Sequence, residues 1–216
     1  AGRRSPDHAL FPYRTADQML DAHGSCGSFT RICAVGDGAQ EWDVLGREPS
    51  PAHPRRLLKT VLGDEVRLSE EHPDLGVSVQ VGWRHSPRFG LVRTTTLTSR
   101  RRTPVELQVV DGLLNVLPPG ATARVQRELS VLLDAYKISE LDESAGLAWT
   151  RLNSGLTDLA EPVESLLATT MWCHHPAGAR LSLVPEREAV TRTRGVRANL
   201  VLRHRTVLEP GQRLQW

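Results

Sequence analysis

Residues 103–120 read Thr-Pro-Val-Glu-Leu-Gln-Val-Val-Asp-Gly-Leu-Leu-Asn-Val-Leu-Pro-Pro-Gly, and this stretch decides the fold. Residues 105–109 alternate apolar with polar side chains, which is the pattern of a strand that buries one face. At residues 111–112 an Asp-Gly pair interrupts the alternation, and we expect the strand to pass there into an apolar loop around Asn115. Two prolines and a glycine at 118–120 then end regular strand pairing. The stretch therefore predicts a strand that leads into a loop carrying an Asp and an Asn.

Similar alternation covers much of the chain, most cleanly over residues 75–83. Gly, Asp and Pro residues separate the runs at intervals of roughly 8–12 residues, a spacing typical of antiparallel sandwiches rather than of alternating βα units. We therefore expect an all-β fold: one large antiparallel β-sandwich over residues 1–216, with residues 1–27 as an extended first segment held by Phe11 and Tyr13. The expected strands cover residues 28–35, 40–45, 56–62, 65–71, 75–83, 89–98, 105–110, 146–152, 166–174, 181–184, 196–208 and 214–216.

Local signals add two hairpins and one helix to this sandwich. The turns Gly36-Asp37-Gly38 and Gly63-Asp64 each join the flanking strands, because Gly and Asp tolerate the positive φ of tight turns. Between residues 121 and 141 the apolar residues recur at helical spacing, which predicts one short helix over residues 122–134. The residues with this spacing are Val125, Leu129, Leu132, Leu133 and Tyr136.

Composition narrows the choice of partner and compartment. The 27 basic and 25 acidic residues leave a net charge of +2, which gives no electrostatic case for a nucleic-acid or membrane partner. Three cysteines cannot form a complete disulfide framework, so we expect a reducing compartment, the cytoplasm. The given sequence contains no apolar run of about 18 residues and no signal-peptide h-region. Because it begins with Ala1 and ends with Trp216 directly after a strand-like run, we expect it to be part of a longer polypeptide.

Two motifs carry a resemblance to a known family. Residues 109–120 (Val-Val-Asp-Gly-Leu-Leu-Asn-Val-Leu-Pro-Pro-Gly) and 132–141 (Leu-Leu-Asp-Ala-Tyr-Lys-Ile-Ser-Glu-Leu) resemble the amino-terminal region of cellobiose-phosphorylase-like proteins. Residues 11–13, 41–42 and 166–172 are similar as well. The resemblance implies a β-supersandwich that precedes an (α/α)6 barrel, in a glycoside phosphorylase or hydrolase whose general acid and phosphate or water site belong to the barrel.

From this resemblance we expect a non-catalytic amino-terminal domain of a carbohydrate-active enzyme. The domain would pack on the helical barrel, shape the substrate cleft and take part in a homodimer, with carbohydrate as the ligand of the parent enzyme and no cofactor. Two alternatives remain open: a free-standing carbohydrate-binding module, and an interaction domain that does not bind sugar.

A glycosidase that acts alone needs two facing carboxylates about 5–10 Å apart. The sequence offers only neighbouring acids, whose side chains lie in turns or point to opposite faces of a strand. These pairs are Asp64/Glu65, Glu70/Glu71 and Asp142/Glu143. The pattern therefore disfavours a self-contained hydrolase.

Polar residues in and after the two motifs form the candidate ligand-binding or interdomain site. Carboxylates and amides can bind sugar hydroxyls, and an aromatic ring can pack on the C–H face of a sugar. The candidates are Asp111, Asn115, Asp134, Tyr136, Lys137 and Glu140. The alternative is structural: Asp111 starts a turn, and Asn115 bonds the backbone of its own loop.

Three further features are ambiguous. On a strand, Cys173 and His175 would share a face, but no second pair at metal-ligand spacing follows, and only His23 and Cys26 could complete a site, so we expect no metal. The arginines at 100–102 could contact phosphate, although a solvated turn is the commoner role. Five tryptophans could stack on sugar, but we expect them in the core, and two coplanar exposed rings would indicate a binding module. They are Trp42, Trp83, Trp149, Trp172 and Trp216.

Overall fold

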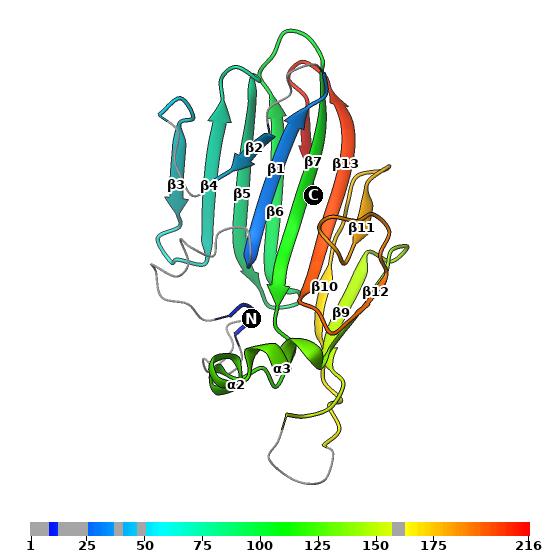
Figure 1. Cartoon of the computed structure of the whole chain (residues 1–216). Helices are drawn as coiled ribbons and strands as arrows, with labels where there is room; N and C mark the ends of the chain where they lie inside the picture. The colour runs from blue at the N-terminus through cyan, green and yellow to red at the C-terminus, as the bar shows by residue number, and fades with distance from the viewer. Residues whose placement is uncertain (1–8, 13–25, 37–40, 47–50, 157–162) are drawn as a thin grey trace.

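The computed structural model describes residues 9–12, 26–36, 41–46, 51–156 and 163–216, and it confirms the predicted all-β class (Figure 1). The strands form three sheets in which every neighbouring pair is antiparallel. Sheet A has the order β11 (Arg180–Ser182), β13 (Ala198–Leu208), β7 (Val105–Val116), β1 (Gly27–Ala34), β2 (Glu41–Val44). Sheet B has the order β14 (Arg213–Gln215), β6 (Gly90–Ser99), β5 (Val77–Ser86), β4 (Glu65–His72), β3 (Arg55–Lys59). Sheet C has the order β10 (Thr169–Trp172), β9 (Leu147–Leu152), β8 (Lys137–Asp142), β12 (Arg192–Arg194).

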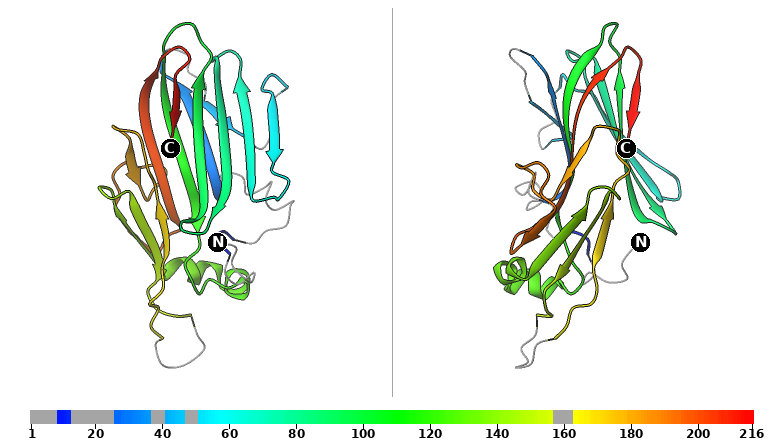
Figure 2. Two further views of the ribbon diagram at one scale, coloured as in Figure 1. Left: turned by 180° about the vertical axis from the view of Figure 1, so that it is seen from behind. Right: turned by 90° about the vertical axis from the view of Figure 1, so that its right-hand side faces the viewer.

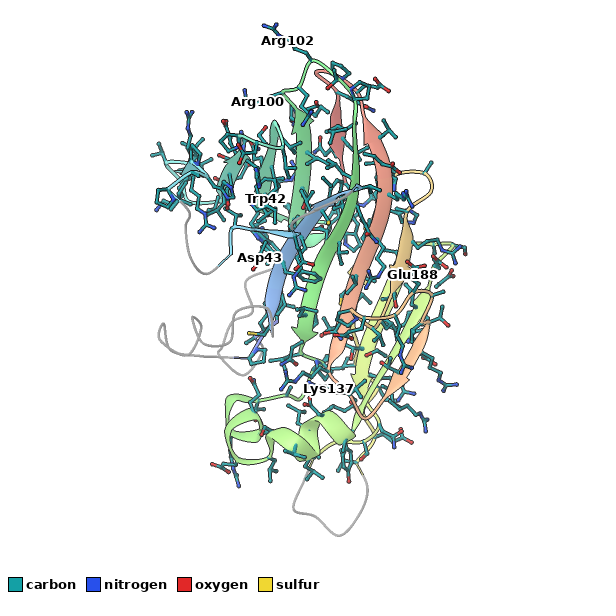
Figure 3. The ribbon with its side chains drawn as sticks, turned by 45° about the horizontal axis from the view of Figure 1, so that its top comes forward. Trp42, Asp43, Arg100, Arg102, Lys137 and Glu188 are labelled. Atoms are coloured by element: carbon teal, nitrogen blue, oxygen red, sulfur yellow. The ribbon has the colours of Figure 1, made fainter. Side chains whose placement is uncertain are left out.

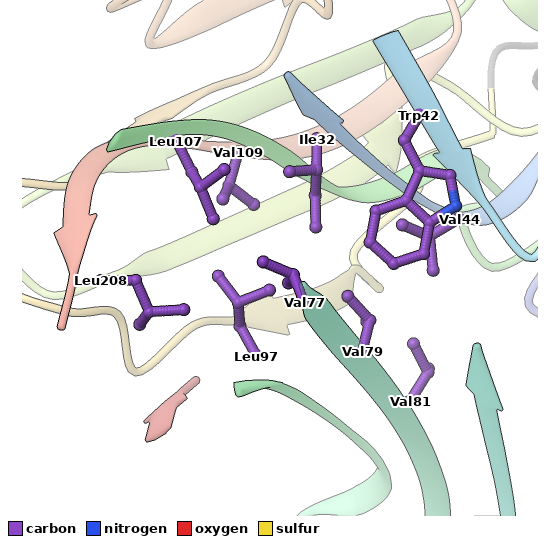
Figure 4. Close-up of a cluster of buried hydrophobic side chains, with 10 residues drawn as sticks. All are labelled: Ile32, Trp42, Val44, Val77, Val79, Val81, Leu97, Leu107, Val109 and Leu208. Atoms are coloured by element: carbon purple, nitrogen blue, oxygen red, sulfur yellow. The ribbon is translucent and has the colours of Figure 1, made fainter. Parts of the chain in front are cut away.

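Sheet A forms one layer of the sandwich, and sheets B and C together form the other (Figure 2). Sheets A and B enclose the upper core, which Figure 4 shows: Ile32, Trp42, Val44, Val77, Val79, Val81, Leu97, Leu107, Val109 and Leu208. Sheets A and C enclose the lower core: Val116, Leu141, Ala148, Met171, Ala179, Leu181, Leu183, Leu200 and Leu202. Because Leu202 and Leu208 lie on the same face of β13, sheets B and C cover successive parts of one face of sheet A.

The central strand β7 is longer than predicted. It continues through Asp111 and Gly112, which pair with Thr30 and Phe29 of β1, and it ends only at Val116. The predicted turn at Asp111 and the apolar loop after it are therefore wrong. Asp111 as a whole residue is 2% exposed, and its carboxylate is hydrogen-bonded on the inner face, so an acidic residue occupies an inward strand position here.

The irregularity of β7 lies further on, at Asn115. Its φ is 53°, and the pairing register with β13 shifts between Ala198 and Leu200. Such a shift is a β-bulge, in which one strand carries an extra residue. The backbone N–H of Asn115 donates to Asn199 Oδ1 at 3.0 Å, which replaces the ladder bond that the bulge removes. The bulge turns Val116 into the lower core, and regular pairing stops before Pro118, as predicted.

The segment predicted as one helix over residues 122–134 contains two very short helices. They are α2 (Ala123–Glu128), capped by the Thr122 hydroxyl, and α3 (Ser130–Ala135). Leu129 separates them with φ −131° and ψ 34°, outside the helical region. Leu133 is the one buried residue of α3, so no continuous apolar face holds the two helices in line.

Most other predicted strands are present. Both hairpins form, although β3 ends at Lys59, and β5 runs on to Ser86, beyond its predicted range of residues 75–83. Strands β8 and β12 were missed, and β10 is shorter than its predicted range. Most of the predicted first segment, including Tyr13, and the turn residues 37–38 lie outside the described residues. Phe11 is described and packs against the lower core.

Candidate functional site

A cleft of about 700 Å³ opens where the three sheets meet. Sheet B extends past the upper core, and its strand ends carry Trp83, Leu91 and Arg93 into the cleft. Sheet C contributes Met171 and Trp172 from β10, and sheet A contributes Leu200 from β13 among others. The walls are therefore mainly apolar, and Met171 and Leu200 belong to the lower core as well as to the cleft wall.

An ion pair between the two layers forms the floor of this cleft. The guanidinium of Arg93 in β6 donates to both carboxylate oxygens of Asp111 in β7, at 2.6 Å and 2.8 Å. Thr30 Oγ1 donates to the same carboxylate at 2.6 Å, and the indole N–H of Trp216 donates to it at 2.7 Å. Asp111 therefore joins β1, β6, β7 and the residue after β14, and its lone pairs are taken by protein donors.

Arg93 is central to this site, and the sequence analysis missed it. The sequence pattern that could have identified it was present, because the alternation of β6 places position 93 on the inward face with Thr95 and Leu97. A charged residue at an inward position requires a buried partner of opposite charge. Arg93 and Asp111 are only 11% and 3% exposed in their side chains, which is the burial that such a pair needs.

Two aromatic rings from different sheets meet at the mouth of the cleft. Phe89, in the turn between β5 and β6, and Trp172, at the end of β10, have ring centroids 5.3 Å apart at an interplanar angle of 55°. Phe89 is 53% exposed and Trp172 is 44% exposed. The prediction that Trp172 lies in the core is therefore wrong.

A second polar cluster lies at the junction of α3, β7 and β8, near the helices (Figure 3). Lys137 Nζ is buried and donates to Asp134 Oδ1 at 2.7 Å and to Asn115 Oδ1 at 3.3 Å. Burial lowers the pKa of Lys137, and the bond to Asp134 opposes that shift. Arg197 Nε lies 3.8 Å from the other oxygen of Asp134. This cluster ties the bulge to the helical end.

The structure therefore divides the predicted site. Asp111 lies on the cleft floor, whereas Asn115, Asp134 and Lys137 form the separate polar cluster, in which Asn115 and Lys137 are buried. Tyr136 is half-buried and packs against a small core beneath the helices. Glu140 lies on sheet C, where it accepts from Trp149 Nε1 at 3.0 Å and pairs with Arg192 at 3.4 Å.

The neighbouring acid pairs do not converge on a common site. Glu70 is 1% exposed and accepts from Trp42, Arg55 and the backbone N–H of Leu45, whereas Glu71 pairs with Arg100 at the surface. The two side chains thus point to opposite faces, as predicted for a strand. In the described part of the chain, Asp111 is the one carboxylate that lines the cleft.

Cys173 lines the cleft just after β10 ends. Burial raises the pKa of its thiol to about 12, and the charge of Asp111 adds to the rise. Across the described ranges, no group of three or more His, Cys, Asp or Glu side chains is arranged to hold a metal ion. His23, which the sequence analysis named with Cys26 as a residue that could complete a site, lies outside those ranges.

The remaining ambiguous residues have clear positions. Arg100 pairs with Glu71, and Arg102 lies exposed in the same β6–β7 loop, at the opposite end from the helices (Figure 3). Trp42 is core as predicted, and Trp83, Trp149 and Trp216 are half-buried. Trp216 packs against both the upper and the lower core.

Comparison with known proteins adds no family assignment. No protein-family model matches the sequence, and no curated protein matches it significantly. Within the described residues, no helix is both long enough and apolar enough to span a membrane.

Proposed function

We propose that this chain is the non-catalytic amino-terminal sandwich domain of a carbohydrate-active enzyme, of the glycoside phosphorylase or hydrolase kind. It packs on a helical catalytic barrel and shapes the substrate cleft of that barrel. One observation carries the proposal: two segments at the helical end of the sandwich, α3 with Leu129 and the segment before β10, both expose large apolar side chains.

We call these residues the helical-end patch. Val131 of α3 is 83% exposed, and Leu166, in the segment that precedes β10, is 85% exposed. Both segments lie at the same end of the molecule (Figures 1 and 2). The full patch comprises Leu129, Val131, Leu132, Val163, Leu166 and Leu167. Apolar patches of this kind mark surfaces that bind another protein or domain.

Two further observations support the proposal. Residues 132–141, one of the two motifs that resemble cellobiose-phosphorylase-like proteins, begin within α3 and so lie beside this patch. In the described residues the cleft holds one carboxylate, and Arg93 neutralises it, so the two facing carboxylates of a glycosidase are not found there. Catalysis would therefore belong to the partner barrel.

The first test is the reading frame that follows Trp216. A long continuation with helical periodicity and paired acidic residues is expected, and an immediate stop codon would contradict the domain role.

The second test uses the full-length protein and measures phosphorolysis and hydrolysis of β-linked disaccharides. Val131→Asp with Leu132→Asp should lower kcat/KM by at least tenfold, because charges in an apolar interface oppose domain packing. The control is Leu58→Asp on the edge strand β3, whose exposure of 62% lies between those of Val131 and Leu132, and it should leave kcat/KM unchanged. Equal activities for both variants would exclude the patch as a domain interface.

The alternative of a free-standing carbohydrate-binding module has less support. Trp172 is the one exposed tryptophan of the five, and its aromatic neighbour Phe89 is tilted by 55° instead of coplanar. The pair therefore does not form the flat platform expected for stacking on a glycan.

A further inference from the structure

The cleft between the three sheets has the size of a small-molecule site. Its volume of about 700 Å³ falls within the range of roughly 300–1,000 Å³ that is typical of ligand pockets. Most of its lining side chains are aliphatic or aromatic, and they come from all three sheets.

The charged groups of the cleft floor already have partners within the protein. Asp111 accepts hydrogen bonds from Arg93, Thr30 and Trp216, and the buried Cys173 thiol remains protonated at neutral pH. At the floor, a charged or hydroxyl-rich group would lose its water and find these groups already paired or neutral, and this loss opposes binding there. Arg84 and His174 also line the cleft, but both are exposed to solvent. The chemistry of the floor therefore favours a neutral ligand.

Arg93 also specifies what kind of neutral ligand fits. Its Nη1 and Nη2 atoms donate to Asp111, whereas its Nε–H has no hydrogen-bond partner. The face of an aromatic ring attracts a guanidinium, and it does not compete for the hydrogen bonds that Asp111 receives. At the mouth, the exposed rings of Phe89 and Trp172 contact each other, one beside sheet B and one on sheet C. Rings that approach such faces in offset or edge geometry gain stabilising contacts.

We propose that this cleft binds a neutral aromatic small molecule, or the aryl group of a larger one. The ring lies between the Phe89–Trp172 pair at the mouth and the Arg93 guanidinium at the floor. This inference does not depend on the proposed domain role, because it concerns a different surface from the helical-end patch.

The experiment titrates this chain with the neutral fluorescent probe N-phenyl-1-naphthylamine. Saturable binding at one site is expected, and a tenfold excess of cellobiose over the probe should not displace it. Phe89→Ala and Trp172→Ala should each raise the Kd about tenfold, because each removes one stacked ring. Leu91→Asp, which places a charge in the cleft, should abolish binding.

The matched control is Trp149→Phe, because Trp149 is a half-buried tryptophan of sheet C that does not line the cleft. It should bind the probe as the wild type does. Thermal unfolding followed by circular dichroism identifies any variant that fails to fold, and the exposed turn position of Phe89 keeps at least one variant informative. Three results would overturn the proposal. They are probe binding that does not saturate, displacement of the probe by cellobiose, and wild-type affinity for the probe in the folded Phe89→Ala and Leu91→Asp variants.

Discussion

Arg93 Nη1 lies 2.6 Å from Asp111 Oδ2, and this contact joins the two layers of the sandwich at the point where sheet B gives way to sheet C. Asp111 stands between Val109, which belongs to the upper core, and Leu113, which packs against the lower core. The pair thus interrupts an apolar face beside the cleft that all three sheets line. Its geometry indicates a structural role in holding the two layers together, because both carboxylate oxygens of Asp111 already accept hydrogen bonds from protein donors.

Removing one member of this pair should destabilise the protein strongly. Asp111→Ala leaves the Arg93 cation buried without its partner, and the expected loss is about 3–5 kcal/mol of unfolding free energy. The double variant Asp111→Leu/Arg93→Met should lose less than the single variant, because no unpaired charge remains. Urea denaturation measures both. Arg205→Ala, at an exposed pair with Glu106, is the control and should cost under about 1 kcal/mol. A small loss of unfolding free energy for Asp111→Ala would contradict this structural role.

Gly112 should be indispensable for the pairing of β7 with β13. A Cβ atom at this position would lie 2.2 Å from the carbonyl oxygen of Leu200 and 3.0 Å from Val201 Cα, so the backbone of β13 would have to move. We expect Gly112→Ala to cost about 2–3 kcal/mol in chemical denaturation. Gly82→Ala is the matched control, since Gly82 lies in the central strand β5 and its nearest neighbours would be 3.9 Å away. If both variants unfold at the same denaturant concentration, the close approach is not limiting.

The sequence predicts those parts of the fold in which each strand alternates regularly. Val77, Val79 and Val81 are all buried on one face of β5, as the pattern over residues 75–83 indicates. The prediction fails at Asp111 because an Asp-Gly pair favours a turn locally, whereas its stability in a strand comes from Arg93 in another sheet. Nothing in the local sequence reveals that partner.

The candidate site was predictable only in part, for a related reason. Asp111 was singled out from the motif, but the cleft around it depends on how sheets B and C meet on sheet A. Strand β8 was missed because Lys137 interrupts the apolar pattern, although it lies buried and bonded to Asp134. Phe89 and Trp172 lie far apart in the sequence, one beside a strand of sheet B and the other on a strand of sheet C. Their contact therefore could not be predicted from the spacing of residues.

Cys173 should resist alkylation in the native protein. Its thiol pKa is raised to about 12, mainly by burial, so only a minute fraction is thiolate at pH 8. Since the thiolate is the reactive form, iodoacetamide should label native Cys173 about a thousandfold more slowly than an ordinary cysteine of pKa about 8.5. Mass spectrometry of labelled peptides measures the rate, and the same protein in urea is the control. Rapid native labelling at pH 8 would show that water reaches the thiol freely.

Lys137 should make stability depend on pH in the alkaline range. Burial lowers its pKa below the ordinary value of 10.5, so the folded state binds this proton less tightly than the unfolded chain does. Between the lowered pKa and 10.5 the unfolded state therefore carries more protons, and unfolding free energy should rise with pH in that window. Below the window the cost of the buried charge is fully present.

The variant Lys137→Met isolates this effect, because its side chain has no titrating proton and fills a similar volume. Urea denaturation of both proteins at intervals from pH 7.5 to 10.5 gives the difference in unfolding free energy. That difference should shift in favour of the wild type as pH rises, whereas titration of other groups cancels between the two proteins. A constant difference would mean that the pKa of Lys137 is the same in the folded and unfolded states. The bond to Asp134, at 2.7 Å, would then offset the effect of burial.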